Sequence, residues 1–152
     1  MKNASLGIQI NQTSHRIRSY VGARIREDSG ISLSPSEGMI LRYIYEKQSD
    51  GVVSAKMLTE RFRISKATTS ELLSGLIRKG LITYAPTESD GRVKRILLTD
   101  EGQKIQETLD AILSKCDEEI VAGFSEEEKQ ELSRLLAKVR QNVKKEGDDG
   151  EK

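Results

Sequence analysis

The chain has 152 residues, of which 36% are apolar and 32% charged, and its formal net charge is +1. This length and composition predict a single soluble domain with a core of Leu, Ile and Val, because Trp is absent and aromatic residues are few. No secretory segment opens the sequence, no apolar run is long enough to span a membrane, and a single Cys excludes an internal disulfide. We therefore expect a cytoplasmic protein that does not bind membranes.

The charges are unevenly distributed along the chain. Residues 1–51, 52–99 and 100–152 carry net charges of +2, +5 and −6. A basic centre followed by an acidic third suggests a lobe that binds a polyanion, joined to a region with a different task. A solvated surface of mixed charge explains the same pattern equally well.

The first predicted helix covers roughly residues 4–28. Its inner stripe has heptad-like spacing and consists of Leu6, Ile10, Thr13, Ile17, Tyr20 and Arg24. This stripe is too thin to form a core by itself, so we expect the helix to pack on other helices.

Three further helices follow, each with a clear start signal. Ser34-Pro35-Ser36-Glu37 is a capping box with Pro at the first helical position, and it begins a helix that runs to about residue 48. Ser54 caps a short helix over 54–62, and a turn at 63–65 leads into a helix over 65–79 that Gly80 ends. Two strands, 81–85 and 93–99, are then joined by a turn at Ser89-Asp90-Gly91.

Two more helices complete the chain. Asp100-Glu101-Gly102-Gln103 is expected to act as the capping box of a helix to about residue 122, and Ser125 caps a last helix to about residue 143. The first of the two has the regular apolar stripe Ile105, Leu109, Ile112, Leu113, Cys116 and Ile120. The last one has the stripe Leu132, Leu135, Leu136, Val139 and Val143, and residues 146–152 form a polar tail that we expect to be disordered.

The central order of helix, three-residue turn, helix and hairpin predicts a winged helix-turn-helix. In this motif the second helix enters the major groove of DNA. Arg92, Lys94 and Arg95 follow the hairpin turn directly. A cationic hairpin next to the recognition helix can reach the DNA backbone or the minor groove, which explains why these cations are placed there.

At this point the chain resembles the MarR family of bacterial transcriptional regulators, over about residues 6–143. The resemblance depends on four motifs in order: Leu33-Ser34-Pro35-Ser36-Glu37, Leu76-Ile77-Arg78-Lys79-Gly80-Leu81-Ile82, Asp90-Gly91-Arg92 and Leu98-Thr99-Asp100-Glu101-Gly102. It implies a mainly α fold with a small β-hairpin wing. It also implies a homodimer in which each winged lobe binds half of a pseudopalindrome in double-stranded DNA.

We therefore predict that residues 1–33 and 100–145 form a helical dimerisation region and that 34–99 form the DNA-binding lobe. The terminal helices support the dimer independently, because their apolar stripes have no obvious partner within a small winged lobe. A compact six-helix monomer is the alternative.

The residues expected to contact DNA lie on the recognition helix, at helix starts and on the wing. By helical spacing Ile64, Thr69, Leu72, Leu73 and Leu76 form the buried face of the recognition helix. In the family the Arg that matches Arg92 enters the minor groove and the Asp orients it. The full set expected to contact DNA is Ser36, Ser54, Lys56, Arg61, Arg63, Ser65, Lys66, Ala67, Thr68, Ser70, Glu71, Asp90, Arg92, Lys94 and Arg95.

The recognition helix departs from the family at two positions. The family often has an Arg near the position of Glu71 and a larger residue at the position of Gly75. Glu71 either accepts a hydrogen bond from cytosine or pairs with Arg78 or Lys66, and the pairing is favoured. Gly75 inside a helix suggests a close approach of another helix. With no Arg on its first turns the helix lacks the usual reader of guanine, so we expect an A·T-rich operator.

Relatives commonly bind phenolic or carboxylate effectors, and the resemblance implies that His15, Arg16, Tyr20 and Tyr43 contribute to such a site. In the alternative, His15 and Arg16 are exposed and both tyrosines belong to the core. Cys116 lies in an apolar stripe, so packing is its expected role and thiol-based redox sensing the minority hypothesis.

The sequence thus predicts a sequence-specific DNA-binding regulator, most simply a repressor that a small molecule releases. No motif for an enzyme, a metal or a cofactor is present. A winged-helix module that binds protein instead of DNA is the alternative from another class.

Overall fold

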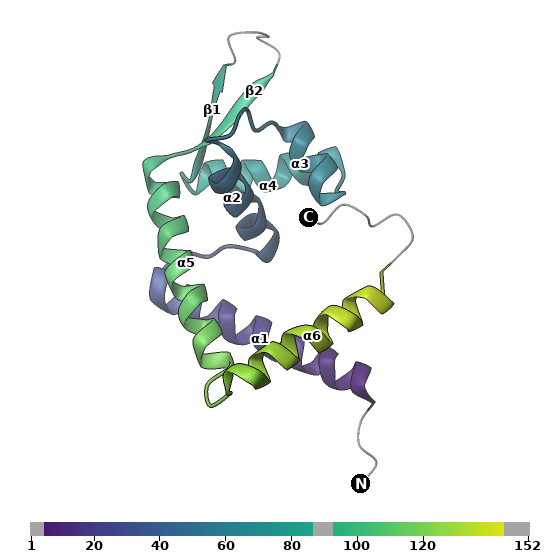
Figure 1. The fold of residues 1–152 in the computed structure, drawn as a ribbon. Coiled ribbons are helices and arrows are strands. Elements are labelled where there is room, and N and C mark those ends of the chain that lie inside the picture. The colour runs from purple at the N-terminus through teal and green to yellow at the C-terminus, as the bar shows by residue number, and fades with distance from the viewer. Residues whose placement is uncertain (1–4, 87–92, 145–152) are drawn as a thin grey trace. The chain divides into compact units, whose positions relative to one another are not determined.

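The structure, a computed structural model, describes residues 5–86 and 93–144 (Figure 1). Within these residues it contains six helices and one two-stranded hairpin. Their bounds are α1 (Leu6–Ser29), α2 (Pro35–Lys47), α3 (Ala55–Phe62), α4 (Lys66–Arg78), β1 (Ile82–Pro86), β2 (Lys94–Leu98), α5 (Asp100–Ile120) and α6 (Glu126–Asn142). The predicted mainly α fold with a hairpin wing is confirmed, and the predicted bounds are correct to within a few residues.

The chain divides into two compact units, residues 1–114 and residues 115–152. The first contains α1 to α4, the hairpin and most of α5. The second contains the end of α5 and all of α6. Asp90 and Arg92 at the wing turn, and the predicted tail at 146–152, lie outside the described residues.

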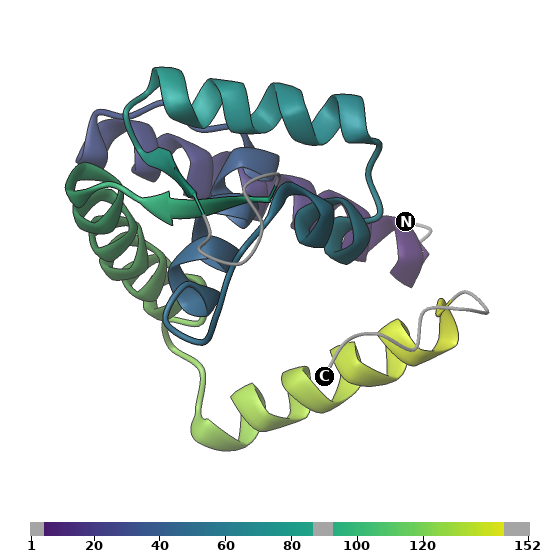
Figure 2. The same ribbon diagram turned by 90° about the horizontal axis from the view of Figure 1, so that it is seen from above.

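The core of the first unit lies where α2, α3 and α4 meet the hairpin (Figures 1 and 2). Each of these elements contributes fully buried aliphatic side chains, and α5 adds one from its inner stripe. The buried members are Ile40, Leu41, Ile44, Val53, Leu58, Leu73, Leu76, Leu81, Ile82, Ile96 and Leu109. Removing these apolar side chains from water is what holds the lobe together.

The hairpin is antiparallel, with Ile82 opposite Leu98 and Pro86 opposite Lys94. It is extended at one edge, because the backbone N–H of Ile96 donates to the carbonyl of Val53 at 2.8 Å. The wing is therefore anchored to the segment that precedes α3.

The start of α5 differs from the predicted capping box. Asp100 is already the first helical residue. The hydroxyl of Thr99 accepts from the N–H of Gly102 at 3.0 Å and donates to the carbonyl of Gly80 at 2.6 Å. A side chain at 102 would collide with the Leu81 carbonyl. Thr99 is the capping residue, and Gly102 is needed because strand β1 begins directly against α5.

The terminal helices leave many of their large apolar side chains exposed in the single chain. No residue of α1 or α6 is buried, whereas Leu109, Ile112 and Cys116 of α5 are. The exposed large apolar residues of α1 are Leu6, Ile8, Ile10, Ile17 and Tyr20, and those of the α6 segment are Leu132, Leu135, Leu136 and Val143. The buried position of Cys116 agrees with a packing role.

Two classes of feature are missing from the part of the chain that the structure describes. None of its helices is both long and apolar enough to cross a membrane. Over the same residues, His, Cys, Asp and Glu side chains form no group that could hold a metal ion.

Candidate nucleic-acid interface

The helix-turn-helix is built by two Ser caps and a left-handed residue between them. Ser54 caps α3, and its hydroxyl accepts from the N–H of Met57 at 3.4 Å. Arg63 then adopts φ 51° and ψ 44° and ends the helix. Two residues later the hydroxyl of Ser65 accepts from the N–H of Thr68 at 3.0 Å and starts α4. The predicted three-residue turn is confirmed.

A hydrogen bond between two hydroxyls joins α3 to α4 beneath this turn. The hydroxyls of Thr59 and Thr69 lie 2.8 Å apart, and Thr69 is only 2% exposed. Each hydroxyl is also within hydrogen-bond distance of a carbonyl in its own helix, Ala55 for Thr59 and Ser65 for Thr69. The pair therefore fixes how the two helices meet.

The recognition helix presents a polar face outward. Thr69, Leu73 and Leu76 are buried, while Ile64 and Leu72 are partly buried. The exposed residues of the first turns are Lys66, Ala67, Thr68, Ser70 and Glu71. Helical spacing thus predicted the outward face correctly.

Glu71 does not pair as expected. Among the described residues no ion pair joins it to Lys66 or to Arg78, and its side chain is exposed. It is the acidic group on a face that is otherwise cationic or hydroxylic. Its carboxylate is free to accept a hydrogen bond from outside the chain.

The cations around α3 have different surroundings. Lys56 lies 4.0 Å from Glu60, and both side chains are well exposed. The guanidinium of Arg61 lies 5.8 Å from the centre of the Phe62 ring. Ser36 is exposed in the first turn of α2.

On the wing, Lys94 and Arg95 have different surroundings. Lys94 is exposed, and its ammonium lies 5.4 Å from the centre of the Tyr84 ring. Arg95 is half-buried and donates to the carbonyl of Gln48 at 3.4 Å. Arg95 therefore helps to attach the wing to the end of α2, and Lys94 is the described cation of the wing that faces solvent.

An ion pair that sequence reasoning missed anchors the far end of the recognition helix. Glu37 is 8% exposed, and one of its carboxylate oxygens accepts from the Lys79 ammonium at 2.6 Å and from the Ser34 N–H at 3.0 Å. Burial alone would raise the pKa of this carboxyl, but the hydrogen bonds from Lys79 and Ser34 and the charges of Lys79 and Arg78 hold it below its usual value.

The close approach expected at Gly75 lies at this ion pair. A Cβ at position 75 would be 2.6 Å from the other carboxylate oxygen of Glu37. The missing side chain thus leaves room for a buried carboxylate between α2 and α4.

The four residues expected to bind an effector are not gathered at one place. His15 and Arg16 line an open hollow of about 450 Å³ together with Asn11 and Gln12. Tyr20 is exposed on α1. Tyr43 packs edge-on against Phe62, with ring centres 5.7 Å apart, beside the core.

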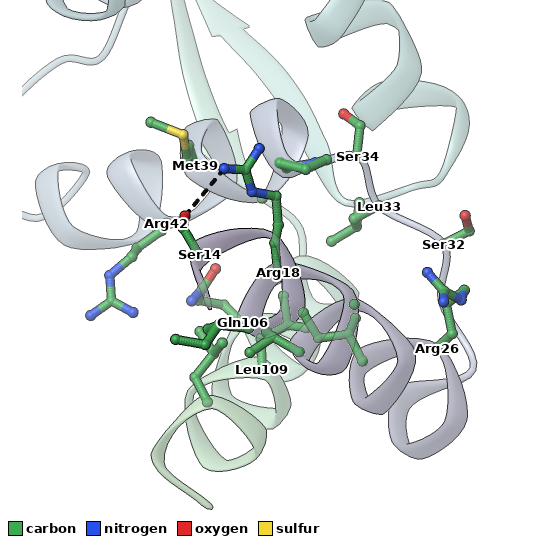
Figure 3. Close-up of a pocket in the computed structure, with 17 residues that line it drawn as sticks. Ser14, Arg18, Arg26, Ser32, Leu33, Ser34, Met39, Arg42, Gln106 and Leu109 are labelled. Atoms are coloured by element: carbon green, nitrogen blue, oxygen red, sulfur yellow. Dashed lines mark hydrogen bonds between the residues drawn. The ribbon is translucent and has the colours of Figure 1, made fainter. Parts of the chain in front are cut away.

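A larger cavity of about 590 Å³ lies in the first unit between α1, the start of α2 and α5 (Figure 3). Ser14, Arg18, Gly22 and Arg26 line it from α1, and Gln106 is among the residues of α5 that complete it. The four-residue spacing along α1 is the sequence signal that could have revealed this face, but those residues read as a solvated polar side.

Comparison with known proteins agrees with this architecture. A family model described as "MarR family" matches residues 31–93. The HTH-type transcriptional regulator YybA of Bacillus subtilis (strain 168) is 28% identical over 119 residues, which cover 78% of this chain and 77% of the relative.

Solved structures share the fold over almost the whole chain. MepR, a transcription regulator of the Staphylococcus aureus multidrug efflux pump MepA, has a TM-score of 0.77 at 23% identity, and the match covers 93% of this chain and 100% of MepR. The S. aureus MepR–DNA complex gives 0.75 at 25% identity with the same coverage. The haem sensor PefR from Streptococcus agalactiae in complex with haem gives 0.72 at 22% identity, covering 99% of this chain and 100% of PefR.

Proposed function

We propose that the chain is a winged helix-turn-helix transcriptional regulator of the MarR family, and that it represses transcription by binding an operator in double-stranded DNA as a homodimer. The observation that carries this proposal is the outward face of α4. The five exposed residues on the first turns of α4 are small or polar, while the opposite face of the same helix is buried in the core. A helix held in this way can enter the major groove without disturbing the fold.

The chemistry of this face favours an A·T-rich operator. Thr68 and Ser70 offer hydroxyls, and the methyl groups of Ala67 and Thr68 can contact the thymine methyl. Glu71, which has no ion-pair partner among the described residues, can accept a hydrogen bond from the cytosine amino group. None of the exposed residues on these first turns is an Arg, the most common reader of guanine.

Homodimer formation is supported by the exposed apolar side chains of α1 and α6. A second copy of the chain would remove these stripes from water, and a pseudopalindromic operator would match the two-fold symmetry. Two linked lobes also bind DNA far more tightly than one.

Replacing Arg92 tests whether the wing takes part. Arg92→Ala should leave the fold and the oligomeric state unchanged, weaken operator binding by about 1–3 kcal/mol per wing, and make the salt dependence shallower. Asp90→Ala should act in the same direction but more weakly, because it loosens the Arg without removing it. Lys138→Ala, which removes an exposed cation of α6, should change neither affinity nor slope.

Fluorescence anisotropy titrations of a labelled operator at several salt concentrations measure these effects. Unchanged affinity and slope for Arg92→Ala would mean that the wing does not contact DNA. Absence of salt-dependent DNA binding by the wild-type protein would instead favour a winged-helix module that binds protein.

The 590 Å³ cavity favours a small-molecule effector as a second part of this function. Its volume suits a drug-sized molecule, and it lies between the winged lobe and helices of the proposed dimerisation region. MepR has been solved with ethidium bromide and PefR with haem. We propose that a phenolic or carboxylate molecule bound in this cavity releases the operator, with Arg18 and Arg26 in the role first expected of His15, Arg16, Tyr20 and Tyr43.

A further inference from the structure

The charged residues that line the 590 Å³ cavity are all cationic. Three of its 17 lining residues are Arg18, Arg26 and Arg42, and none of the 17 is acidic (Figure 3). Arg42 is already neutralised, because its guanidinium lies 2.9 Å from both Glu46 and Asp110. Arg18 has only a weak 3.5 Å hydrogen bond to the Ser14 hydroxyl, and no ion pair joins Arg18 or Arg26 to an acidic side chain in the described part of the chain. Two guanidinium groups of the cavity are therefore available to anions.

These two arginines lie apart along the wall of the cavity that α1 forms. They are eight residues apart on one face of α1, which separates their Cα atoms by about 12 Å along the helix axis. In Figure 3 Arg18 lies near the middle of the view and Arg26 at its right-hand side, with Leu33 between them. Both guanidinium groups reach back along α1, since a Cβ at Gly22 would lie 3.4 Å from Nη1 of Arg26, and Nη2 of Arg18 lies 3.5 Å from the Ser14 hydroxyl.

The space between the arginines is apolar. Aliphatic side chains from α1, α5 and the segment before α2 line it, and they are Ile17, Val21, Ile25, Leu33, Leu109 and Leu113. An apolar chain or ring system would gain by leaving water there. Carboxylate or phosphate groups at its ends would form charge-assisted hydrogen bonds with the guanidinium groups.

We infer that this cavity binds an elongated apolar molecule with an anionic group at each end, one held by Arg18 and the other by Arg26. The inference rests on the proposed effector role of the cavity and specifies its ligand class. It also separates this site from that of a protein that binds a cationic dye, such as ethidium in MepR, because a cation would meet two guanidinium groups and no acid.

The test uses linear α,ω-dicarboxylates of increasing length, with the monocarboxylate and the trimethylammonium salt of each length as probes. Binding to the full chain without DNA is measured by isothermal titration calorimetry, below the aggregation concentration of each probe. The dicarboxylates should show an optimum length and, at that length, bind about tenfold or more tightly than the monocarboxylate. The ammonium salts should bind more weakly than either.

Arg18→Gln and Arg26→Gln should each reduce the affinity for the dicarboxylate to that for the monocarboxylate. Arg16→Gln is the matched control, because it removes an exposed cation from the same helix outside this cavity, and it should change nothing. Gly22→Leu should abolish binding of every probe while the circular dichroism spectrum stays that of the wild type.

Equal affinity for dicarboxylates and monocarboxylates, tighter binding of the ammonium salts, or an equal loss with Arg16→Gln would overturn the inference. Because DNA is absent, failure of the proposed regulatory function leaves these results unaffected. Displacement of the operator by the optimal dicarboxylate is a separate measurement, and it tests the effector role alone.

Discussion

Arg63 has a left-handed backbone conformation, which is unfavourable for a residue that carries a side chain. It is the one non-glycine residue with a positive φ in the described chain, and the left-handed region disfavours such residues by about 1–2 kcal/mol. A Gly at this turn would avoid the strain, so the presence of a cation favours a role for the side chain. We expect that role to be a contact with a DNA phosphate.

Arg63→Gly should therefore separate stability from function. Relief of strain outweighs or balances the extra entropy of a Gly in the unfolded chain, so stability should stay level or rise by up to about 1 kcal/mol. Operator affinity should fall, with a salt slope smaller by about one. Urea unfolding and salt titrations measure the two effects.

Arg63→Ala is the matched control. It removes the same cation but keeps the strained backbone, so it should lose the same affinity without the gain in stability. If Arg63→Gly bound the operator as tightly as the wild type, Arg63 would not contact DNA.

The buried carboxylate of Glu37 predicts a particular pH dependence of stability. Its pKa is lowered in the folded state from an ordinary value of 4.5. The stabilisation is complete above that unfolded value and is lost as the pH falls through the lower folded pKa. Glu37→Gln should cost about 1–3 kcal/mol at neutral pH, because it leaves Lys79 without its charged partner.

Unfolding by urea between pH 3 and pH 7 checks this prediction. The difference in free energy of unfolding between the wild type and Glu37→Gln should become smaller below about pH 4.5. If that difference in free energy of unfolding stayed constant over this pH range, the charge of the ion pair would contribute nothing to stability.

At the scale of the helices, the contact between α2 and α4 predicts opposite effects for two glycines. Gly75→Ala should gain about 1 kcal/mol of helix propensity. It should lose more, because its Cβ would lie 2.6 Å from the Glu37 carboxylate and force that side chain away from Lys79. We expect a net loss of about 1–2 kcal/mol.

Gly38→Ala in α2 is the control, because a Cβ there meets no atom within 4 Å. It should stabilise the protein by up to about 1 kcal/mol. Thermal unfolding of both variants decides the matter, and a Gly75→Ala variant that is more stable than the wild type would contradict the placement of Glu37.

The element bounds could be predicted because their signals are local. The capping boxes at Ser34 and Ser125 and the glycine after α4 each act within a few residues, and the structure places them where they were expected. The prediction for the start of α5 was wrong because its capping residue depends on a distant contact. Thr99 caps that helix while its hydroxyl donates to Gly80, 19 residues earlier, and the sequence around Asp100 carries no trace of that contact.

The candidate sites were harder to predict where they depend on distant contacts. The outward face of α4 followed from helical spacing alone, whereas the pairing of Glu37 with Lys79 joins residues 42 apart. Tyr43 was assigned to an effector site because aromatic residues suit one, but it packs against Phe62 of another helix. The cavity arginines were missed because an isolated helix gives no sign of which polar face another helix will cover.

At the scale of the whole molecule, the exposed stripe of α6 predicts how a single charge should act. Leu135 is 45% exposed in the single chain, so Leu135→Asp should disturb the folded monomer little. In a dimer the same carboxylate would be buried without a partner, and the dimer should dissociate. DNA binding should fall steeply with it.

Gln130→Asp places the same charge on the opposite face of α6 and should leave the dimer intact. Sedimentation equilibrium together with circular dichroism distinguishes dissociation from unfolding. A Leu135→Asp protein that stays dimeric with wild-type stability would show that α6 does not form the interface.

Selection of bound sequences from random duplex DNA by the purified protein tests the central claim most directly. A homodimeric regulator should enrich an A·T-rich inverted repeat whose half-site centres lie about one helical turn, or about 10 base pairs, apart. Enrichment of no sequence, or of a single unrepeated site, would contradict a two-fold symmetric, sequence-specific regulator.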